Sequence, residues 1–465
     1  MPKTALWWAT TKNSFDWRNK MFKRVLIANR GEIALRIIRA LREMNIESVA
    51  VYSTADKDSL PAMTATKSIC IGPAKPAESY LDQDLLIDVA QQMGCDAIHP
   101  GYGFLSENAE FARKCEENGI CFIGPSWQLI EKMGDKQSAK KLMLENNVPV
   151  VMGSDDIVRS SEEAVKVAAK IGYPVIIKAT AGGGGKGMRI ARDEDELLKE
   201  LTSAQAEAAA AFGNGDCYIE KYIEQPKHIE IQLLADKYGN VVHLGERNCS
   251  VQRHHQKLLE ESPSWGLSSE LRAEMGETAV RAAKAAGYNS VGTVEFIMDA
   301  SGNYYFMEMN TRIQVEHPVT EMLTDIDLVR EQIYIASGRK MELRQEDIEF
   351  RGNVIECRIN AKGPGTVKVL HFPEGLGVRT ESSLFEGCTV TPFYDSMIAK
   401  IIVHDRSRIE AIRRMRRCLE ELVISGVPTN IGEMYMIMNH PEFVSGNYDT
   451  SFWEKNKESI GAVDI

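Results

Sequence analysis

Several common sequence features are missing from this chain of 465 residues, and each absence argues against a class of protein. No apolar run approaches the length of a membrane span, so we expect a protein that does not enter a membrane. The nine cysteines are scattered and form no C-x-x-C pair. This argues against a disulfide framework or a zinc site and favours reduced thiols in a cytoplasmic compartment. There is also no long internal repeat and no low-complexity linker.

Basic residues are outnumbered by acidic ones, and the formal net charge is −11. An acidic chain argues against non-specific binding of nucleic acid as its main role. The stretch 406–417 is basic, but four apolar residues fall on one helical face there or just beyond it: Ile412, Met415, Leu419 and Leu422. We therefore interpret the arginines as the solvated side of a packed helix.

The patterns that are present predict several domains, since 44% hydrophobic content over this length allows an ample core. From Met21 the chain alternates strand and helix patterns, which predicts an N-terminal α/β domain with a parallel sheet. The first twenty residues hold three tryptophans without periodicity. The predicted division is an extension (1–20), the N-terminal domain (21–134), a linker helix (135–149), a small α+β unit (150–223) and a mixed α/β region with antiparallel strands (224–465).

A glycine-rich segment in the small unit is a candidate phosphate site, although no GxxxxGK[ST] P-loop occurs. A buried strand over 173–180 runs into Ala181 and four consecutive glycines, whose bare amides can approach phosphate oxygens. The following residues, 188–191, read as a strand, whereas a dinucleotide fingerprint requires a helix there. This order of strand, glycine flap and strand resembles the phosphate cover of kinases more than a dinucleotide-binding turn. A flexible hairpin tip is the alternative, and Lys178 is the candidate phosphate ligand.

The stretch 302–318, GNYYFMEMNTRIQVEHP, is the most informative in the chain. As a strand it would place five polar side chains on one face. These are Glu308, Asn310, Arg312, Gln314 and Glu316. Alternation alone also fits the solvated face of an ordinary antiparallel strand.

The residues before this stretch favour a functional site. The run 291–299 has strand character and carries Glu295, and 300–303 supply turn residues. A hairpin would place Glu295 beside Glu308 and Asn310. Two carboxylates and an amide oxygen suit Mg²⁺, which prefers a few carboxylates together with water and substrate phosphates.

From Met21 to about Asn456 the chain closely resembles biotin carboxylase, an ATP-grasp enzyme. The resemblance implies an N-terminal parallel-sheet (pre-ATP-grasp) domain, an ATP-grasp unit with a small α+β lid, and a mixed α/β C-terminal domain with an antiparallel sheet. The motifs stand in the family order: IANRGEIALRIIRA, AIHPGYGFLSEN, YPVIIKA, GGGGKGMR, IEKYIE, HIEIQ, QRHHQK, EMNTRIQVEHPVTE, ECRINA and YDSMIAK.

The resemblance also implies roles for individual residues. For ATP it implies Lys136, Lys178, Gly184, Gly185, Glu220, Lys221, Tyr222, Ile223, His228, Gln252, His255, Glu295 and Glu308. For Mg²⁺ or Mn²⁺ it implies Glu295, Glu308 and Asn310, and for bicarbonate Lys257, Arg312, Gln314 and Val315. Glu316 would deprotonate bicarbonate, Arg358 would bind the biotin ureido group, and Lys257 and Arg312 would share in catalysis.

In the reaction that the resemblance implies, bicarbonate attacks ATP to give carboxyphosphate. Carboxyphosphate then breaks into carbon dioxide and phosphate, and the phosphate deprotonates biotin N1. An enolate-like oxygen then needs a cation, which Arg358 offers permanently. An ion pair with Glu356 on the same strand face is the alternative for Arg358.

No AMKM-type biotin attachment motif and no carboxyltransferase sequence occur. We therefore expect biotin on a separate carrier protein, partner carboxyltransferase subunits and a homodimer. The favoured assignment is the first half-reaction of acetyl-CoA carboxylase, which supplies malonyl-CoA for fatty acid synthesis. The alternatives are a subunit of a pyruvate or propionyl-CoA carboxylase, a catalytically silent ATP-binding subunit, and another ATP-grasp ligase that joins a carboxylate to an amine.

Three departures from the family pattern stand out. The segment 360–367, NAKGPGTV, is about seven residues shorter than usual and follows Arg358 directly. Shortening there could affect Arg358 or the dimer, although surface loops tolerate length changes. His254 replaces a common basic residue, and Ala181 is followed by four glycines where five are common.

Overall fold

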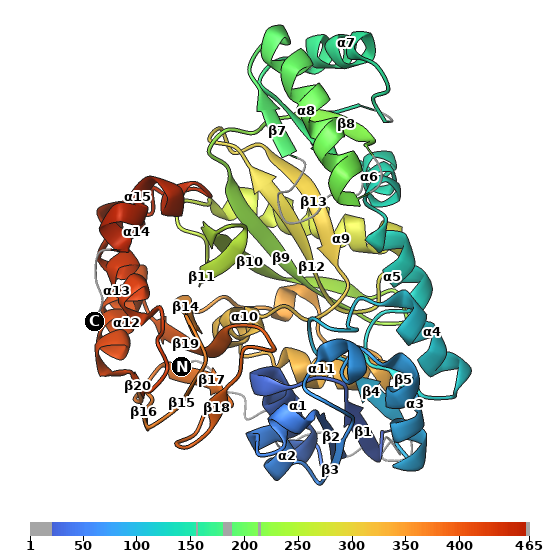
Figure 1. The fold of residues 1–465 in the computed structure, drawn as a ribbon, viewed down its shortest axis with the longest axis vertical. Helices are drawn as coiled ribbons and strands as arrows, with labels where there is room; N and C mark the ends of the chain where they lie inside the picture. The colour runs from blue at the N-terminus through green and yellow to red at the C-terminus, as the bar shows by residue number, and fades with distance from the viewer. Residues whose placement is uncertain (1–20, 155–156, 180–187, 213–214, 462–465) are drawn as a thin grey trace.

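The computed structural model describes residues 21–154, 157–179, 188–212 and 215–461. Figure 1 shows a body of sheets and helices with a smaller lobe standing apart at one end of the long axis. The predicted extension 1–20 lies outside the described residues, as do Gly184 and Gly185 of the glycine flap.

The N-terminal domain is built on a five-stranded sheet in the order β3-β2-β1-β4-β5. Every neighbouring pair is parallel, which confirms the predicted parallel α/β sheet. The sheet is fully apolar at its centre, where Val25, Leu26 and Ile27 have no exposed surface. Its strands are β1 (Arg24–Ile27), β2 (Glu47–Tyr52), β3 (Lys67–Cys70), β4 (Ala97–His99) and β5 (Cys121–Phe122), and its helices are α1 (Gly31–Glu43), α2 (Leu60–Thr64), α3 (Gln83–Gln92), α4 (Ala109–Glu117) and α5 (Trp127–Gly134).

A short helix, α6 (Lys136–Glu145), follows α5 and leads towards the smaller lobe (Figure 1). It begins at Lys136 because the Asp135 side chain accepts a hydrogen bond from the Ser138 amide at 2.6 Å. The helix predicted for the linker is therefore present, but it ends at Glu145, before the predicted boundary at 149.

The smaller lobe, here called the lid, contains a three-stranded antiparallel sheet in the order β7-β6-β8. The strands that flank the glycine flap are antiparallel neighbours, as the strand, flap and strand interpretation requires. Alternate residues of β6, among them Val175 and Ile177, are buried in one apolar cluster with α7 and α8. The elements are α7 (Ser161–Ile171), β6 (Val175–Ala179), β7 (Met188–Ala191), α8 (Glu194–Phe212) and β8 (Cys217–Lys221).

The body is organised by an eight-stranded sheet in the order β13-β12-β9-β10-β11-β14-β19-β17, in which all neighbours are antiparallel. Helix α9 (Ser269–Ala286) packs on an apolar face formed by strands such as β9. The strands are β9 (Lys227–Ala235), β10 (Val241–Arg253), β11 (Gln256–Ser262), β12 (Ser290–Met298), β13 (Tyr304–Asn310), β14 (Asn353–Asn360), β17 (Val378–Ser382) and β19 (Met397–Asp405).

The basic stretch near residue 410 forms α12 (Arg408–Glu421), as predicted. All four expected apolar residues are buried in the C-terminal core: Ile412, Met415, Leu419 and Leu422. The arginines of this stretch therefore belong to a packed helix. The remaining C-terminal elements are β15 (Gly365–Thr366), β16 (Val369–His371), β18 (Thr389–Val390), β20 (Val423–Ser425), α13 (Ile431–Asn439), α14 (Pro441–Ser445) and α15 (Phe452–Ile460).

The short segment after β14 turns without disturbing that strand. The Ala361 amide donates to the Ser396 carbonyl and the Lys362 amide to the Pro428 carbonyl, each at 2.7 Å. The Asn430 side chain donates to the Arg358 carbonyl at 3.1 Å. Arg358 stays paired with Lys400 of β19, so the backbone at this position is held in the sheet.

Within the described part of the chain, no helix is both long and apolar enough to cross a membrane. All nine cysteines lie among the described residues, and all nine are free thiols, as predicted from their spacing.

Candidate active site

The β12–β13 hairpin places its acidic residues side by side. Glu295 and Glu308 are register partners, and Thr293 pairs with Asn310. The Asn310 side chain donates to Glu295 Oε1 at 3.0 Å. The turn forms because the Asp299 carboxylate accepts the Ser301 and Asn303 amides, at 2.8 and 2.9 Å. The hairpin predicted from the alternation therefore brings all three proposed metal ligands together.

The predicted strand is too long, however. Strand β13 ends at Asn310, so Arg312, Gln314 and Glu316 lie in a loop that leads into α10 (His317–Thr324). The strand stops because β13 is at the edge of the sheet and β12, its neighbour in the sheet, pairs with it no further than Asn310. The three side chains nevertheless turn toward the same site, as the next contacts show.

Lys257 of β11 lies at the centre of this site. Its Nζ atom is 2.6 Å from Glu230, 3.0 Å from Glu295 and 2.7 Å from Glu316. Burial alone would lower the pKa of Lys257, but the three carboxylates outweigh burial and hold the pKa well above its usual range. Lys257 is therefore a permanent cation that links the hairpin to Glu316.

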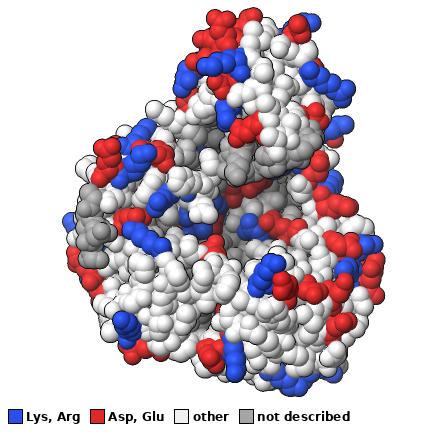
Figure 2. Space-filling view, viewed as in Figure 1, with Lys and Arg blue, Asp and Glu red and all other residues white. Residues whose placement is uncertain are grey.

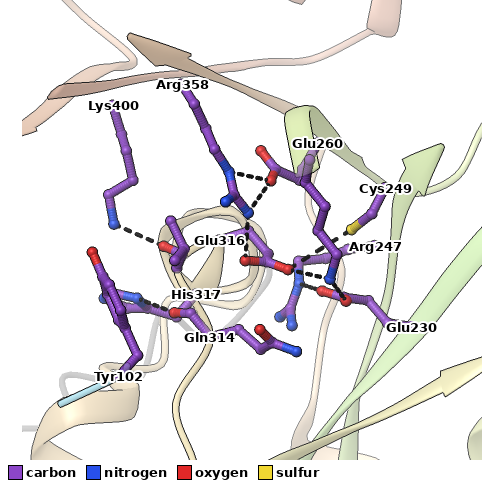
Figure 3. Close-up of polar contacts among 12 residues, drawn as sticks. Tyr102, Glu230, Arg247, Cys249, Glu260, Gln314, Glu316, His317, Arg358 and Lys400 are labelled. Carbon is purple, nitrogen blue, oxygen red and sulfur yellow. Dashed lines mark hydrogen bonds and ion pairs between the residues drawn. The ribbon is translucent and has the colours of Figure 1, made fainter. Parts of the chain in front are cut away.

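Glu316 is fully buried and is shared by two cations. One oxygen contacts Lys257, and the other accepts from Arg358 Nη2 at 2.9 Å. Burial would raise the pKa of Glu316, but Lys257 and Arg358 together hold it well below the usual value. Figure 3 shows Arg358 reaching from its strand to Glu316 and Glu260 at once.

The contacts of Arg358 are not those of the alternative interpretation, an ion pair with Glu356. Arg358 pairs with Glu260, with Nε at 2.6 Å from Oε1, and with Glu316, and not with Glu356 on its own strand. The arginine side chain is only 14% exposed, so a surface ion pair is wrong. The guanidinium lies between two carboxylates from different parts of the chain.

The loop residues that were predicted to bind bicarbonate form a hydrogen-bonded row. Arg312 donates to Gln314 Oε1 and to Asn310 Oδ1, each at 3.0 Å. Gln314 in turn donates to Glu295 Oε1 at 3.0 Å. The Val315 carbonyl accepts from Lys400 Nζ at 2.7 Å. The loop is therefore tied to the hairpin at one end and to β19 at the other.

The predicted nucleotide residues lie on both the lid and the body. In the lid, Glu220 of β8 pairs with Lys178 at 2.6 Å and with Lys140 at 2.7 Å. Lys221 donates to the Tyr173 carbonyl at 2.7 Å, and the Tyr222 amide to the Pro174 carbonyl at 3.0 Å. Ile223 follows directly in the chain.

In the body, His228 lies at the hairpin. Its Nε2 atom is 3.0 Å from Glu295, and its Nδ1 atom is 3.0 Å from Gln252 Nε2. His255 is different, because it is exposed in the β10–β11 turn and makes no hydrogen bond within the described chain. The contacts thus join His228 and Gln252 to the site but leave His255 at its edge.

A divalent cation fits the hairpin. The Glu308 carboxylate accepts no hydrogen bond from the described residues, although it faces Glu295 across the hairpin. Burial and then Glu295 raise the pKa of Glu308, while Lys136 lowers it. A cation between the carboxylates would remove that repulsion. Because Asn310 Oδ1 now accepts from Arg312, the Asn310 amide would have to turn to act as a ligand.

Several site residues were missed by sequence reasoning. Glu107 holds Arg312 at 2.7 Å, and Glu32 pairs with the fully buried Lys400 at 2.9 Å. Arg247 has no exposed surface and donates to Glu230 at 2.5 Å. Lys400 could have been found, since it is a lone lysine in the apolar run Met397–Val403, the same signal that identified Lys178.

Figure 2 shows a hollow between the lid and the body, with acidic and basic side chains on its floor. Lysines from the lid, a pair of carboxylates suited to a metal, and a buried lysine and arginine can together bind the phosphates of a nucleotide and stabilise an acyl-phosphate reaction. The fold and the site therefore define an ATP-grasp type of ligase.

Comparison with known proteins identifies the family. A biotin carboxylase N-terminal domain matches residues 21–130, a carbamoyl-phosphate synthase L chain ATP binding domain matches residues 135–344, and a biotin carboxylase C-terminal domain matches residues 356–455. Biotin carboxylase 1 of Bacillus subtilis is 57% identical over 93% of this chain and 98% of its own length. The chain belongs to the biotin carboxylase family, and it is an ATP-dependent ligase that carboxylates biotin.

Relatives from other carboxylases are nearly as similar. A pyruvate carboxylase subunit of Methanothermobacter thermautotrophicus is 50% identical over 95% of this chain and 91% of its own length. Among solved structures, the biotin carboxylase domain dimer of Hydrogenobacter thermophilus 2-oxoglutarate carboxylase, with MgADP, ADP and bicarbonate, has a TM-score of 0.89. That structure is 50% identical, and the match covers 96% of this chain and 100% of that one.

Proposed function

We propose that this chain carries out the first half-reaction of acetyl-CoA carboxylase, in which biotin on a separate carrier protein is carboxylated with ATP and bicarbonate. The observation that carries the assignment of the chemistry is the placement of Lys257, which joins Glu295 of the hairpin to Glu316. Lys257 thereby connects the proposed metal and phosphate region to the buried Glu316, whose other oxygen contacts Arg358. The Bacillus and plant relatives, named biotin carboxylase, favour a free-standing subunit.

In this proposal Glu295, Glu308 and Asn310 hold Mg²⁺ or Mn²⁺, which would neutralise charge on the phosphates of ATP when bound. Lys178 contributes from the lid, where it now pairs with Glu220 and can exchange that partner for a phosphate. Glycine amides of the flap would complete the phosphate contacts.

Glu316 accepts the proton of bicarbonate, while Lys257, Arg312, Gln314 and the Val315 backbone hold the anion. The low pKa of Glu316 depends on Lys257 and Arg358. When Lys257 turns to bicarbonate, the pKa of Glu316 rises and the carboxylate becomes a better base. Arg358 then stabilises the oxygen of the biotin ureido group as N1 loses its proton.

We also propose that the chain forms a homodimer and works with carboxyltransferase subunits. A dimer is named for the Hydrogenobacter relative. A second candidate is service in a pyruvate or 2-oxoglutarate carboxylase, favoured by the subunits of those enzymes that align along nearly all of this chain.

The choice of holoenzyme is tested with biotinylated carrier proteins. Carriers from acetyl-CoA, pyruvate and 2-oxoglutarate carboxylases of one host should be compared by kcat/KM for ATP-dependent carboxylation. We expect the acetyl-CoA carboxylase carrier to give the highest value. A clear preference for a keto acid carboxylase carrier would overturn that assignment without touching the chemistry.

The metal assignment predicts the effect of Glu308→Gln. The substitution keeps the size of the side chain but removes one of the two carboxylates, so binding of Mg²⁺ with ATP should weaken by about tenfold or more, at least as much as losing an outer partner of a metal ligand. The readout is the Mg²⁺ concentration that gives half-maximal ATP cleavage. An unchanged Mg²⁺ requirement would remove Glu308 from the metal site.

A further inference from the structure

Besides the carboxylates of the hairpin, a second pair of carboxylates lies beside Arg358 on strands β11 and β14. Glu260 of β11 and Glu356 of β14 are register partners in the antiparallel sheet, and neither has any exposed surface. Side chains at opposing positions point to the same face of a sheet, and like charges placed there destabilise it. Glu356 and Arg358 are two residues apart on β14, so all three side chains lie on one face.

Most oxygens of this pair lack a partner. Glu260 Oε1 accepts from Arg358, but Glu260 Oε2 and both oxygens of Glu356 are buried without a hydrogen bond in the described structure. Neither carboxylate is exposed to bulk solvent, so two charges at opposing positions would be costly. Burial of two facing carboxyl groups favours the protonation of one of them, as in the paired carboxylates of other active sites.

The surrounding residues do not supply enough positive charge to keep both Glu260 and Glu356 ionised. Arg358 is already shared with Glu316, and Lys400 of β19 is bound to Glu32 and to the Val315 carbonyl. The charged and titratable groups that act on the pair come from the neighbouring strands, from the loop before α10 and from the N-terminal domain: Lys257, Arg358, Lys400, Glu316, Cys249, Cys357 and Tyr102.

The titration behaviour agrees with the geometry. Burial raises the pKa of Glu260 to about 7, with Arg358 lowering it and Glu316 raising it. Burial also raises the pKa of Glu356 well above its usual value, against the opposing effect of Lys400. Both directions favour retention of a proton by the pair, which titrates as one unit.

Arg358 connects the pair to the reaction. The same Nη2 atom contacts Glu260 Oε1 and Glu316 Oε2, as Figure 3 shows. If Arg358 turns toward the biotin ureido oxygen, both carboxylates lose their shared cation at the same moment. Glu316 has by then received a proton from bicarbonate, and Glu260 is the other carboxylate that Arg358 contacted.

We propose that Glu260 and Glu356 act as one proton-holding pair, which positions Arg358 and takes up the bicarbonate proton from Glu316 when Arg358 turns to biotin. The proposal rests on the function proposed above. The bicarbonate O–H bond breaks as that oxygen joins the γ-phosphorus, and the bond from the γ-phosphorus to the ADP oxygen breaks so that ADP leaves. The proton passes to Glu316 and then to Glu260, and Glu316 returns to its ionised form. The proton leaves to solvent when Arg358 returns, and no electrons are transferred.

The kinetic test uses Glu260→Gln and Glu356→Gln, with Glu261→Gln as the matched control. Glu261 is the next residue of β11, is likewise buried, and also pairs with an arginine, Arg408 at 2.7 Å, but on the other face of the sheet. Biotin-dependent ATP cleavage is measured against pH at saturating ATP and bicarbonate.

We expect Glu260→Gln to lower kcat by about tenfold or more with the KM for ATP unchanged, and to remove the limb of the pH profile near neutrality, because general acid–base groups contribute at least this much. Glu356→Gln should move that limb to lower pH and lower kcat by a smaller factor than Glu260→Gln, because the amide can donate to the ionised Glu260 and makes it a weaker proton acceptor. Glu261→Gln should change neither. A wild-type pH profile in Glu260→Gln, or equal changes in all three variants, would overturn the proposal.

A spectroscopic readout decides the case if Glu260→Gln does not fold or if the wild type fails to cleave ATP. In the infrared spectrum at neutral pH, the wild-type protein should show the carbonyl stretch of a buried protonated carboxyl, and Glu356→Gln should lose it. Absence of that band in the wild type overturns the proposal. A wild type that shows the band but never cleaves ATP instead refutes the proposed function.

The pair also makes stability depend on pH. The native state keeps a proton that the unfolded chain releases above the ordinary glutamate pKa, so the native state binds more protons and the free energy of unfolding falls as pH rises towards the native pKa. From about pH 5 to about pH 8 the wild type should therefore lose more thermal stability than Glu356→Gln. Identical slopes for the two proteins would count against a shared proton.

Discussion

Replacing Arg358 by alanine is expected to leave ATP binding intact and to reduce biotin carboxylation by roughly a hundredfold or more, the cost of losing one preorganised donor at a developing oxyanion. Arg358 lies beyond Glu316 as seen from the hairpin, and it contacts neither of the proposed metal carboxylates. Nucleotide affinity therefore should not depend on it. The measurement is ATP affinity by calorimetry beside the rate of carboxylation of free biotin.

Arg358→Lys tests the geometry of the same role. Lysine keeps the charge but cannot donate to Glu260 and Glu316 from one planar group, so it should recover only part of the lost rate. Turnover at the wild-type level in Arg358→Ala would remove this residue from the mechanism. A parallel loss of ATP affinity would instead indicate that the substitution disturbs the fold.

Glu316→Gln is expected to abolish most bicarbonate-dependent ATP cleavage, with a loss of about a hundredfold to ten-thousandfold, the usual contribution of a general base. Glu316→Gln acts at an earlier step than Arg358→Ala, because bicarbonate must lose its proton before biotin takes part. The variant should therefore fail both with and without biotin.

The substitution also leaves Lys257 and Arg358 with one carboxylate fewer in a buried site, so folding must be checked by thermal unfolding. Glu261→Gln is again the matched control, since it removes a buried carboxylate that faces Arg408 away from the site. If Glu316→Gln cleaved ATP with bicarbonate at the wild-type rate, the base would have to be sought elsewhere.

The local part of the site was predictable from sequence. The alternation around Glu308, the turn residues near Gly302 and the strand that carries Glu295 are short-range signals, and they specify one hairpin. Helix α6 and the apolar face of α12 were predictable for the same reason. The exit from the strand at Asn310 was not, because it depends on where the neighbouring strand β12 stops pairing.

The contact of both Lys257 and Arg358 with Glu316 could not be derived from sequence spacing. Lys257 and Arg358 are about a hundred positions apart, and they meet because β11 and β14 are neighbours in the sheet. Nothing in either strand specifies that pairing locally, so only the family resemblance placed both residues in one site. The opposition of Glu260 and Glu356 follows from the same pairing, and it was missed for that reason.

The most direct test of the account is phosphate release by the purified protein with ATP, Mg²⁺ and bicarbonate, with and without free biotin. We predict release that requires bicarbonate and is stimulated by biotin, which would also show that the short segment 360–367 is compatible with turnover. Tight ATP binding without any bicarbonate-dependent release would contradict the account and indicate a catalytically silent subunit.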